Sequence, residues 1–464
     1  MRLYDLILQN ENLRFVDTAT GRFRNIKELH RSVSIDDQQG LCFIYSDSRL
    51  ESVRIFLNFL DSRYTIVMLS AQLHEEFKRQ LEQTYKPYYI YDPQRAAISA
   101  YKSIEAAADV SLFQRANRID YYINPRIRLL LSTSGSTGSP KLVKLSNSNL
   151  VSNTLAILDY LPVQPSDVVP LNVPISFVYG LSVFNTNCLR ANTIVCTGQD
   201  ILRKEFWTDF KKYKFSTLNG VPYVYEMLYR IGFFKNNHPE LRYMTHSGGA
   251  LSQPLTRLVA EYALQYDKLF YSQYGQTEAT GRMAYVPPAD LLRKNGSIGL
   301  PTSIGRFEID ELSGELIYYG PNVSGGYASR IEDLGTFDHT DKLYTGDIAR
   351  QDEDGYYYIT GRKKRFIKLL GNRINLDDIE RILKNNLGGG VFICTGVEDS
   401  YLSVAHPDKN LDEKAIQRVL RDKLSIHPKM IRVSLLDEVP LTHNGKIDYQ
   451  RVILSAESHA PHTT

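Results

Sequence analysis

Residues 129–150 read LLLSTSGSTGSPKLVKLSNSNL, a loop rich in glycine and hydroxyl side chains between two apolar runs. Glycine allows backbone N–H groups to converge on an anion, hydroxyls donate hydrogen bonds and lysine adds positive charge, so phosphate is a candidate ligand. The common nucleotide-binding loop instead has Gly-Lys-Ser/Thr leading directly into a helix. Here Lys141 follows Pro140, and residues 142–145 alternate as in a short strand. A surface turn of serine and glycine is the alternative interpretation.

The sequence on either side of this loop predicts two strands that the loop joins, followed by a helix. The apolar residues 127–131 predict the first strand. Val151, Leu155 and Leu158 follow at helical spacing, and the polar residues 147–149 mark the predicted start of the helix.

A strand–helix–strand unit is predicted upstream of the loop. Residues 41–45 and 64–69 are apolar runs typical of strands, and Asp47 or Ser48 is the predicted cap of the helix between them. Such units form mostly parallel sheets with helices on their faces. No Gly-x-Gly-x-x-Gly occurs here, so a dinucleotide-binding fold is not supported. The apolar residues of the helix are Val53, Phe56 and Leu60.

Length, charge and cysteine usage limit the class of protein. At 464 residues the chain is longer than one core usually supports, which predicts more than one domain. A formal net charge of +3 is too small to indicate nucleic acid or an anionic membrane as a partner. No apolar run reaches the roughly 18 residues of a membrane span, and no signal-peptide pattern is present, so we expect a cytoplasmic protein. Without Cys-x-x-Cys spacing, buried free thiols are expected rather than a zinc site at Cys42, Cys188, Cys196 and Cys394.

The predicted secondary structure changes twice in the second half of the chain. Residues 307–320 and the tyrosine-rich 355–361 predict β-hairpins, and beyond Gly361 short helices alternate with short strands. The sequence therefore predicts an α/β fold with a large domain, residues 1–361, of mixed and parallel sheets flanked by helices plus a β-rich subdomain. A small α+β domain, residues 362–464, follows.

Four further stretches contain residue types suited to nucleotide chemistry. They are YGQTE (274–278), YTGD (344–347), GRKKRFIKLLG (361–371) and THNGKIDY (442–449). A tyrosine can stack on a base, a threonine can contact phosphate, and a carboxylate can bind magnesium or ribose hydroxyls. Each also has an ordinary interpretation: a strand end with a glycine turn, an Asp that caps a turn, a solvated basic hairpin, and an exposed turn lysine, Lys446.

The order of these motifs resembles that of the adenylate-forming superfamily. This superfamily includes acyl-CoA synthetases, the adenylation domains of nonribosomal peptide synthetases, and beetle luciferases. The resemblance extends from residue 50 to residue 449. It implies that ATP and Mg²⁺ activate a small carboxylic acid as an acyl-adenylate, with release of pyrophosphate. It further implies that the acyl group then passes to a pantetheine thiol, either of CoA or of an acyl carrier protein.

The resemblance assigns roles in nucleotide binding to residues that match the family's motifs. Tyr274 would stack on adenine, Thr277 would contact the α-phosphate, and Glu278 would bind Mg²⁺. Asp347 and Arg362 would hold the ribose. The loop over the ATP phosphates would comprise Thr133, Ser134, Gly135, Ser136, Thr137, Gly138 and Lys141. Further nucleotide contacts would come from Gly248, Gly249, Ala250, Gly275 and Gln276.

The resemblance also implies two arrangements of a mobile small domain. Lys446 would bridge the substrate carboxylate and the α-phosphate during adenylation. The small domain would then rotate about a hinge at Lys364, and Lys368 and Gly371 would line the tunnel for pantetheine. A glycine suits a narrow tunnel because a side chain would obstruct it.

Departures from the family's pattern bear on the substrate. Acyl-CoA synthetases commonly have His at the position of Phe177, whereas amino-acid-activating domains have Phe followed by an Asp that pairs with the ammonium group. Here Val178 follows, so a buried ammonium would lack its counter-charge. We therefore expect a fatty, aryl or other carboxylic acid without an α-amino group. The predicted substrate pocket comprises Phe177, Val178, Val221, Ser247 and Thr280.

Other activities remain open at this stage. The chain could adenylate an amino acid, pass the acyl group to an amine or alcohol, or bind a nucleotide without catalysis. Retention of Glu278, Asp347, Arg362 and Lys446 together argues against the last of these. The identity of the acid and the choice between CoA and a carrier protein are not encoded in these motifs.

Overall fold

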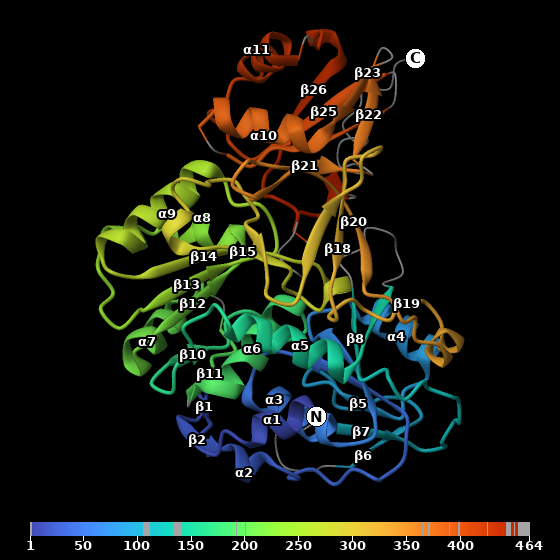
Figure 1. Cartoon of the computed structure of the whole chain (residues 1–464). Coiled ribbons are helices and arrows are strands. Elements are labelled where there is room, and N and C mark those ends of the chain that lie inside the picture. The colour runs from blue at the N-terminus through green and yellow to red at the C-terminus, as the bar shows by residue number, and fades with distance from the viewer. Residues whose placement is uncertain are drawn as a thin grey trace.

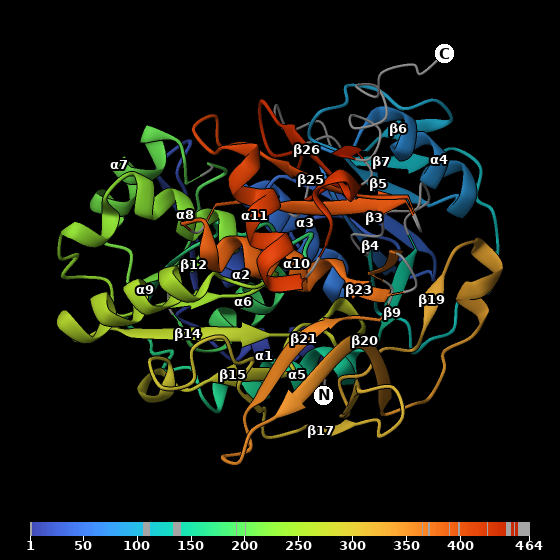
Figure 2. The same ribbon diagram turned by 90° about the horizontal axis from the view of Figure 1, so that it is seen from above.

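The structure is a computed structural model of the chain. It describes residues 2–104, 112–132, 141–191, 193–199, 201–363, 365–369, 372–388, 390–397, 400–424, 426–441, 447–449 and 451–452. Sheets and helices form a large lower part, and the orange-red C-terminal elements lie above it (Figure 1). Seen from above, α10 (Leu376–Asn386) and α11 (Glu413–Leu424) lie over the middle of the molecule (Figure 2).

The largest sheet has eight strands in the order β19-β9-β8-β4-β3-β5-β7-β6. Its centre is parallel, as the strand–helix–strand pattern predicts, because helix α3 (Leu50–Asp61) carries the chain from β3 to β4. Strands β8 and β9 are antiparallel neighbours, and the glycine-rich stretch comes between them in the sequence. The strands are β3 (Leu41–Ser46), β4 (Thr65–Ser70), β5 (Tyr89–Tyr91), β6 (Tyr101–Ser103), β7 (Leu112–Arg115), β8 (Leu129–Ser132), β9 (Leu142–Leu145) and β19 (Tyr327–Ala328).

Two further sheets contain strands from the N-terminal region and from the middle of the chain. The five-stranded sheet has β12, β13 and β14 in parallel, with helices α7 (Lys204–Tyr213), α8 (Pro222–Arg230) and α9 (Gln253–Gln265) between or beside them. The smaller sheet has the order β10-β11-β1-β2. The strands are β12 (Thr217–Gly220), β13 (Tyr243–His246), β14 (Leu269–Tyr274), β15 (Ala284–Val286), β16 (Leu300–Pro301), β1 (Arg14–Asp17), β2 (Arg22–Asn25), β10 (Val168–Pro170) and β11 (Thr193–Cys196).

The β-rich subdomain and the C-terminal unit follow in order along the chain. The subdomain is an antiparallel sheet of β17 (Arg306–Ile309), β18 (Glu315–Tyr319), β20 (Lys342–Gln351) and β21 (Tyr357–Arg362). The C-terminal strands are β22 (Phe366–Leu369), β23 (Asn372–Asn375), β24 (Ile393–Val397), β25 (Tyr401–His406) and β26 (Ile431–Leu435). The predicted α/β fold class is thus confirmed, whereas the domain boundary near residue 361 stays a prediction.

Three local predictions need correction. The cap of α3 is Arg49 rather than Asp47 or Ser48, because Ser48 adopts a left-handed conformation and delays the start of the helix. Asp47 still accepts a hydrogen bond from the Arg49 N–H at 3.1 Å. The YTGD segment lies within β20 at a register irregularity, where Gly346 has φ +73°, rather than in a turn between strands.

The third correction concerns helix α5 (Asn147–Leu158), whose position was predicted but whose buried face was not. Leu155 is 43% exposed, whereas Asn149 and Asn153 are buried. The Asn149 side-chain amide donates to the carbonyls of Pro321 and Val323, at 2.8 and 2.9 Å. The Asn153 amide donates to a backbone carbonyl in the segment after β14. Hydrogen bonds to irregular backbone therefore override the apolar periodicity here.

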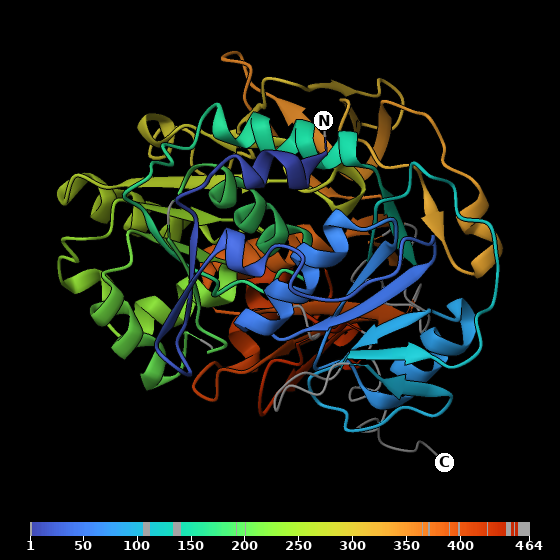
Figure 3. The ribbon, with the colours of Figure 1, turned by 90° about the horizontal axis from the view of Figure 1, so that it is seen from below.

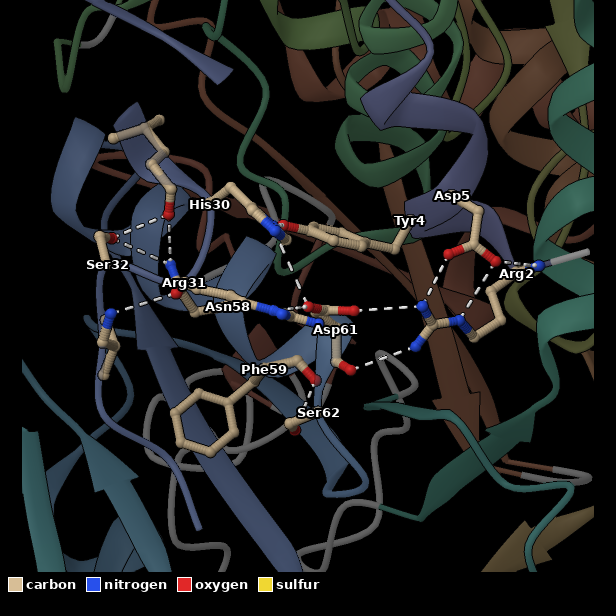
Figure 4. Close-up of polar contacts among 12 residues, drawn as sticks. Arg2, Tyr4, Asp5, His30, Arg31, Ser32, Asn58, Phe59, Asp61 and Ser62 are labelled. Atoms are coloured by element: carbon tan, nitrogen blue, oxygen red, sulfur yellow. Dashed lines mark hydrogen bonds and ion pairs between the residues drawn. The ribbon is translucent and has the colours of Figure 1, made fainter. Parts of the chain in front are cut away.

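The N-terminal helix α1 (Leu3–Leu8) is attached to the end of α3 by charged contacts around Asp61 (Figure 4). The Asp61 carboxylate pairs with Arg2 at 3.1 Å and with Arg31 at 3.3 Å. The hydroxyl of Tyr4 and Nδ1 of His30 lie 2.5 Å apart beside this cluster. Seen from below, these blue elements and the teal α5 lie on the side away from the C-terminal unit (Figure 3).

The described residues include all four cysteines and every helix that the structure defines. All four cysteines are buried and free, as predicted. Among the described residues, no three His, Cys, Asp or Glu side chains are placed to hold a metal ion. No helix in the described part of the chain has both the length and the apolar character needed to cross a membrane.

A buried ion pair provides a test of the large sheet. Lys78 on α4 (Glu75–Tyr85) and Asp92 after β5 lie 2.8 Å apart, with side chains 2% and 0% exposed. Asp92→Asn leaves a buried ammonium without its counter-charge, so we expect urea unfolding to show a loss of about 3–5 kcal/mol. The control is Arg79→Gln on the same helix, because the Arg79–Glu75 pair is exposed. A loss below about 1 kcal/mol is expected there, and equal effects in both variants would contradict the assignment.

Candidate active site

Three predicted motif segments meet at the carboxyl ends of β12, β13 and β14. Ser247 follows β13, and its N–H donates to the carbonyl of Gly220 at 3.2 Å. Gly248 has φ +90°, and a Cβ placed on it would lie 3.2 Å from Cγ1 of Val221. Ligands of open α/β sheets bind at this edge of the strands. The parallel topology therefore brings together the predicted adenine and substrate segments.

The carboxylate of Asp347 is the centre of the predicted nucleotide site. Tyr274 O–H donates to Oδ2 at 2.5 Å, and the Gln276 amide donates to the same oxygen at 3.0 Å. Arg362 Nε donates to Oδ1 at 3.1 Å, since Arg362 is the register partner of Asp347 across β20 and β21. Asp347 is 3% exposed, whereas the Arg362 side chain is 63% exposed. Three predicted residues thus converge on the buried carboxylate of a fourth, Asp347.

The surroundings of Tyr274 keep its hydroxyl protonated. Burial and, next, the Asp347 carboxylate raise the pKa of Tyr274 well above its usual range. Its ring also makes an edge contact with Phe307, at 6.3 Å between centroids. Tyr274 therefore acts as a hydrogen-bond donor at neutral pH, and its stacking on adenine stays a prediction.

A second cluster brings Glu278 close to the end of the glycine-rich loop. Tyr327 O–H donates to Oε1 of Glu278 at 2.8 Å. Nζ of Lys141 lies 5.8 Å from the centre of the same tyrosine ring, a cation–π distance. Tyr327 reaches this position because it pairs with Val143 across β19 and β9. The predicted magnesium ligand and the lysine of the predicted phosphate loop thus both contact Tyr327.

The YGQTE segment and the residues after it form a tightly closed loop. A Cβ placed on Gly275 would lie 1.5 Å from the carbonyl oxygen of Gly281, so only glycine fits. Thr280 adopts φ +56°, and its hydroxyl donates to the carbonyl of Asn322 at 2.6 Å. The buried amide of Asn322 donates in turn to the backbone carbonyls of Ala279 and Arg282. These bonds hold Thr277 and Glu278 in the 3₁₀ turn η2 (Thr277–Ala279).

The predicted substrate residues lie around this loop. Phe177 and Val178 are half-buried at the start of α6 (Val178–Arg190). A Cβ on Gly281 would lie 3.3 Å from Cγ2 of Val178, which places Val178 beside Thr280. The segment after β13 packs against the start of α8, because a Cβ on Gly249 would lie 3.1 Å from Pro222. Ala250, the next residue, is exposed.

In the C-terminal unit, hydrogen bonds join Arg365, which follows the predicted hinge, to Tyr449, which follows the predicted catalytic lysine. Arg365 donates to the hydroxyl of Tyr449 at 3.0 Å and to Oε1 of Glu380 at 2.9 Å. Leu441 and Ile447 form an antiparallel bridge on either side of residues 442–446. The backbone of Lys368 lies in β22. Outside the described residues are Thr133, Ser134, Gly135, Ser136, Thr137, Gly138, Lys364, Gly371 and Lys446.

Sequence reasoning missed several residues that hold the site together. Tyr327 and Asn322 lie outside the quoted motifs, whereas Arg365 and Tyr449 lie within GRKKRFIKLLG and THNGKIDY but have no predicted role there. The partners of all four lie far away along the chain. Only the strand pairings and the loop packing reveal their contacts.

The close approach at Gly275 gives a direct test of the loop. For Gly275→Ala we expect unfolding to cost about 2 kcal/mol less than for the wild type, because the added methyl group collides with backbone. Gly390→Ala is the control, since a Cβ there would meet only the ring of Phe392, at 3.9 Å. Differential scanning calorimetry should show a clear decrease in Tm for the first variant alone. An unchanged Tm in Gly275→Ala would contradict the described loop.

Comparisons with known proteins agree with this geometry. Residues 41–328 match the family described as AMP-binding enzyme. A probable CoA ligase of Humulus lupulus is 25% identical over 342 residues, which are 69% of this chain and 64% of that protein. An L-proline–[L-prolyl-carrier protein] ligase of Streptomyces coelicolor is 30% identical over 353 residues, 70% of this chain and 66% of that protein. The chain thus spans slightly less than two thirds of the length of these relatives.

A solved structure shares the fold along almost the whole chain. ATP-bound MatB from Rhodopseudomonas palustris superposes with a TM-score of 0.76, over 99% of each chain, at 19% sequence identity. The family match covers more than half of the chain and includes the glycine-rich loop, the strand ends of β12 to β14 and the YGQTE segment. The resemblance to adenylate-forming enzymes is therefore confirmed, and the chain belongs to the AMP-binding enzyme family.

Proposed function

We propose that this protein uses ATP to activate a carboxylic acid as an acyl-adenylate, releases pyrophosphate, and transfers the acyl group to a pantetheine thiol. The observation that supports this most strongly is the convergence of Tyr274, Gln276 and Arg362 on the buried carboxylate of Asp347. A carboxylate held in this way is suited to accept hydrogen bonds from two ribose hydroxyls.

The proposed chemistry relies on positioning and electrostatics. A carboxylate is a poor electrophile, and it is repelled by the triphosphate that it must attack. Thr277 would contact the α-phosphate, and Lys446 would neutralise charge as the carboxylate oxygen adds in line to phosphorus. The resulting mixed anhydride is reactive toward a thiol, which explains why adenylation precedes thioester formation.

The residues near Glu278 fit a magnesium ion that is held mainly by phosphate. Among the described residues no cluster of three ligating side chains exists, so a dedicated protein cage is absent from that part of the chain. Magnesium at nucleotide sites usually takes one or two carboxylates and completes its shell with phosphate oxygens and water. When bound, it would neutralise charge on the triphosphate. Glu278, oriented by Tyr327, would hold it.

The proposal includes a large domain, residues 1–361, and a mobile small domain, residues 362–464, with a hinge near Lys364. In support, one buried apolar cluster is built only from residues after 362, including Ile367, Ile379 and Leu402. In the second arrangement Lys368 and Gly371 would line the path of pantetheine.

The proposed substrate is a carboxylic acid without an α-amino group. Val178, beside Thr280, offers no counter-charge for an ammonium group. The acceptor is CoA or an acyl carrier protein, since the relatives are named for both kinds of thiol. Activation of an amino acid, transfer to an amine or alcohol, and nucleotide binding without catalysis are the competing outcomes.

Carboxylate-dependent ATP–pyrophosphate exchange tests the adenylation step. We expect exchange with one class of acid. In Lys446→Ala we expect the exchange rate to fall on the order of 10²–10³, because the positive charge that Lys446 would place beside the reacting oxygens is lost. Lys414→Ala on α11 is the control and should retain wild-type exchange. An absence of exchange across fatty, aryl, hydroxy, dicarboxylic and amino acids, with ATP binding retained, would contradict the proposal. Brisk exchange with an amino acid alone would contradict the assignment at Val178.

The two-arrangement account makes a separate prediction at Gly371. Gly371→Leu should leave pyrophosphate exchange within about threefold of the wild type but slow thioester formation at least tenfold, because the side chain would obstruct the pantetheine path. Single-turnover assays with preformed adenylate would measure the second step. Equal loss of both steps would rule out a separate thioester arrangement.

A further inference from the structure

A small cavity lies behind the proposed substrate site, between α5, α6 and the strands β12 to β14. It leaves room for about one water molecule. Asn219 and Thr245 line it, two residues before Val221 and Ser247 on parallel strands. Val221 and Ser247 come directly after the ends of β12 and β13, so the cavity lies about one layer of side chains before the predicted substrate segments.

The charged group of this cavity is Arg282, a fully buried arginine. Its Nε donates to Oε1 of Gln273 at 2.9 Å, and its guanidinium lies 4.5 Å from the centre of the Tyr179 ring. Its backbone is fixed, because its carbonyl accepts hydrogen bonds from Asn153 and Asn322. Within the described part of the chain, Arg282 forms no ion pair with a carboxylate, and none of the side chains that line the cavity is acidic.

Other buried cations of the chain have a different environment. Lys78 is paired with the carboxylate of Asp92. Arg128 donates to the backbone carbonyls of Phe59 and Tyr64, which fixes it in a structural role. Arg282 instead borders a cavity, and its neighbours are the Gln273 amide, the Tyr160 hydroxyl and the Tyr179 ring, none of which carries a negative charge at neutral pH. A buried charge without a counter-charge is costly, so an anion supplied from outside would stabilise it.

The cavity also collects buried polar atoms that lack a hydrogen-bond partner. These atoms belong to side chains that are at most 3% exposed. Two come from α6 and two from the strands: Thr186 Oγ1, Asn187 Oδ1, Asn219 Nδ2 and Tyr243 O–H. Buried polar groups are nearly always paired in folded proteins. Their concentration around Arg282 indicates a site that a polar ligand group completes.

We propose that Arg282 and the hydrogen-bond donors among these side chains bind a second carboxylate of the acyl substrate, so that the enzyme activates one end of a short dicarboxylic acid. This inference rests on the proposed function, and it specifies the substrate class of the same site. The guanidinium would pair with the distal carboxylate, while Asn219 Nδ2 and the Tyr243 hydroxyl would donate to it. The reacting carboxylate would remain near Ser247 and Val221.

Strand geometry limits the length of the acid. Two residues along a strand span roughly 7 Å, which corresponds to the two ends of a diacid of about four to six carbons. The cavity has room for about one water molecule, so the distal carboxylate would displace that water and move the lining side chains apart, and a bulky distal group is excluded. A long fatty acid would place an apolar chain against Arg282 and the unpaired polar atoms, which is unfavourable.

The test compares acids that differ only at the distal end. Pyrophosphate exchange is measured with succinate and butyrate, glutarate and pentanoate, and adipate and hexanoate, with 5-hydroxypentanoate as a neutral polar probe. We expect at least one diacid to exceed its matched monoacid tenfold or more in kcat/KM. In Arg282→Met we expect that diacid to lose on the order of 10² in kcat/KM, while the matched monoacid changes less than about fivefold.

Matched variants separate recognition from stability. Thr186→Val removes an unpaired hydroxyl inside the cavity and should raise KM for the diacid several-fold. Thr217→Val removes a buried, unpaired hydroxyl that does not line the cavity, and KM should not change. Thermal unfolding of Arg282→Met shows whether the variant is folded, and Arg282→Lys, which keeps the charge, should recover part of the preference for the diacid.

The outcomes distinguish the inference from the proposed function. Exchange with monoacids but not with diacids would overturn the inference and leave adenylation intact. Equal loss for both acids in a folded Arg282→Met would assign Arg282 a structural role, which also overturns it. A preference for 5-hydroxypentanoate over glutarate would show that the site binds a neutral group. No exchange with any acid would instead contradict the proposed function itself.

Discussion

The buried carboxylate of Asp347 joins parts of the molecule that are far apart in the sequence. It binds Tyr274 and Gln276 at the end of a parallel strand, and Arg362 on the neighbouring antiparallel strand. The chain passes from Arg362 into the C-terminal unit, so this carboxylate lies where two sheets and the predicted hinge meet. Removing its charge would break the contacts between the predicted nucleotide site and the strand that leads into the segment proposed to move.

Backbone packing imposes a second constraint on the same site. The contact between Gly275 and the Gly281 carbonyl forces the YGQTE segment into a closed loop. Asn322, from the connection between β18 and β19, holds that loop with its side-chain amide. From this loop Glu278 reaches Tyr327, and Arg282 lines the cavity. One rigid turn thus positions both a predicted metal ligand and the proposed anion site.

The buried cations Lys78 and Arg282 have different electrostatic environments. Beside the large sheet, the buried ammonium of Lys78 on α4 is neutralised within the protein by Asp92. Behind the substrate segments, Arg282 has no such partner among the described residues, and several polar atoms around it are unpaired. A structural ion pair stabilises one state of the protein, whereas an incomplete polar site stabilises whichever ligand completes it.

The sequence by itself determined the element order, the parallel centre of the large sheet and the family, because apolar periodicity and glycine-rich motifs are local signals. It also named Tyr274, Gln276, Asp347 and Arg362, since each lies within such a motif. Only the tertiary structure decided that they meet at one carboxylate, that polar Asn153 rather than apolar Leu155 is buried on α5, that Tyr327 binds Glu278, and that Arg282 lines a buried cavity. These contacts depend on backbone carbonyls and side chains brought together by strand pairing, and no local pattern in the sequence encodes which distant segments will pair.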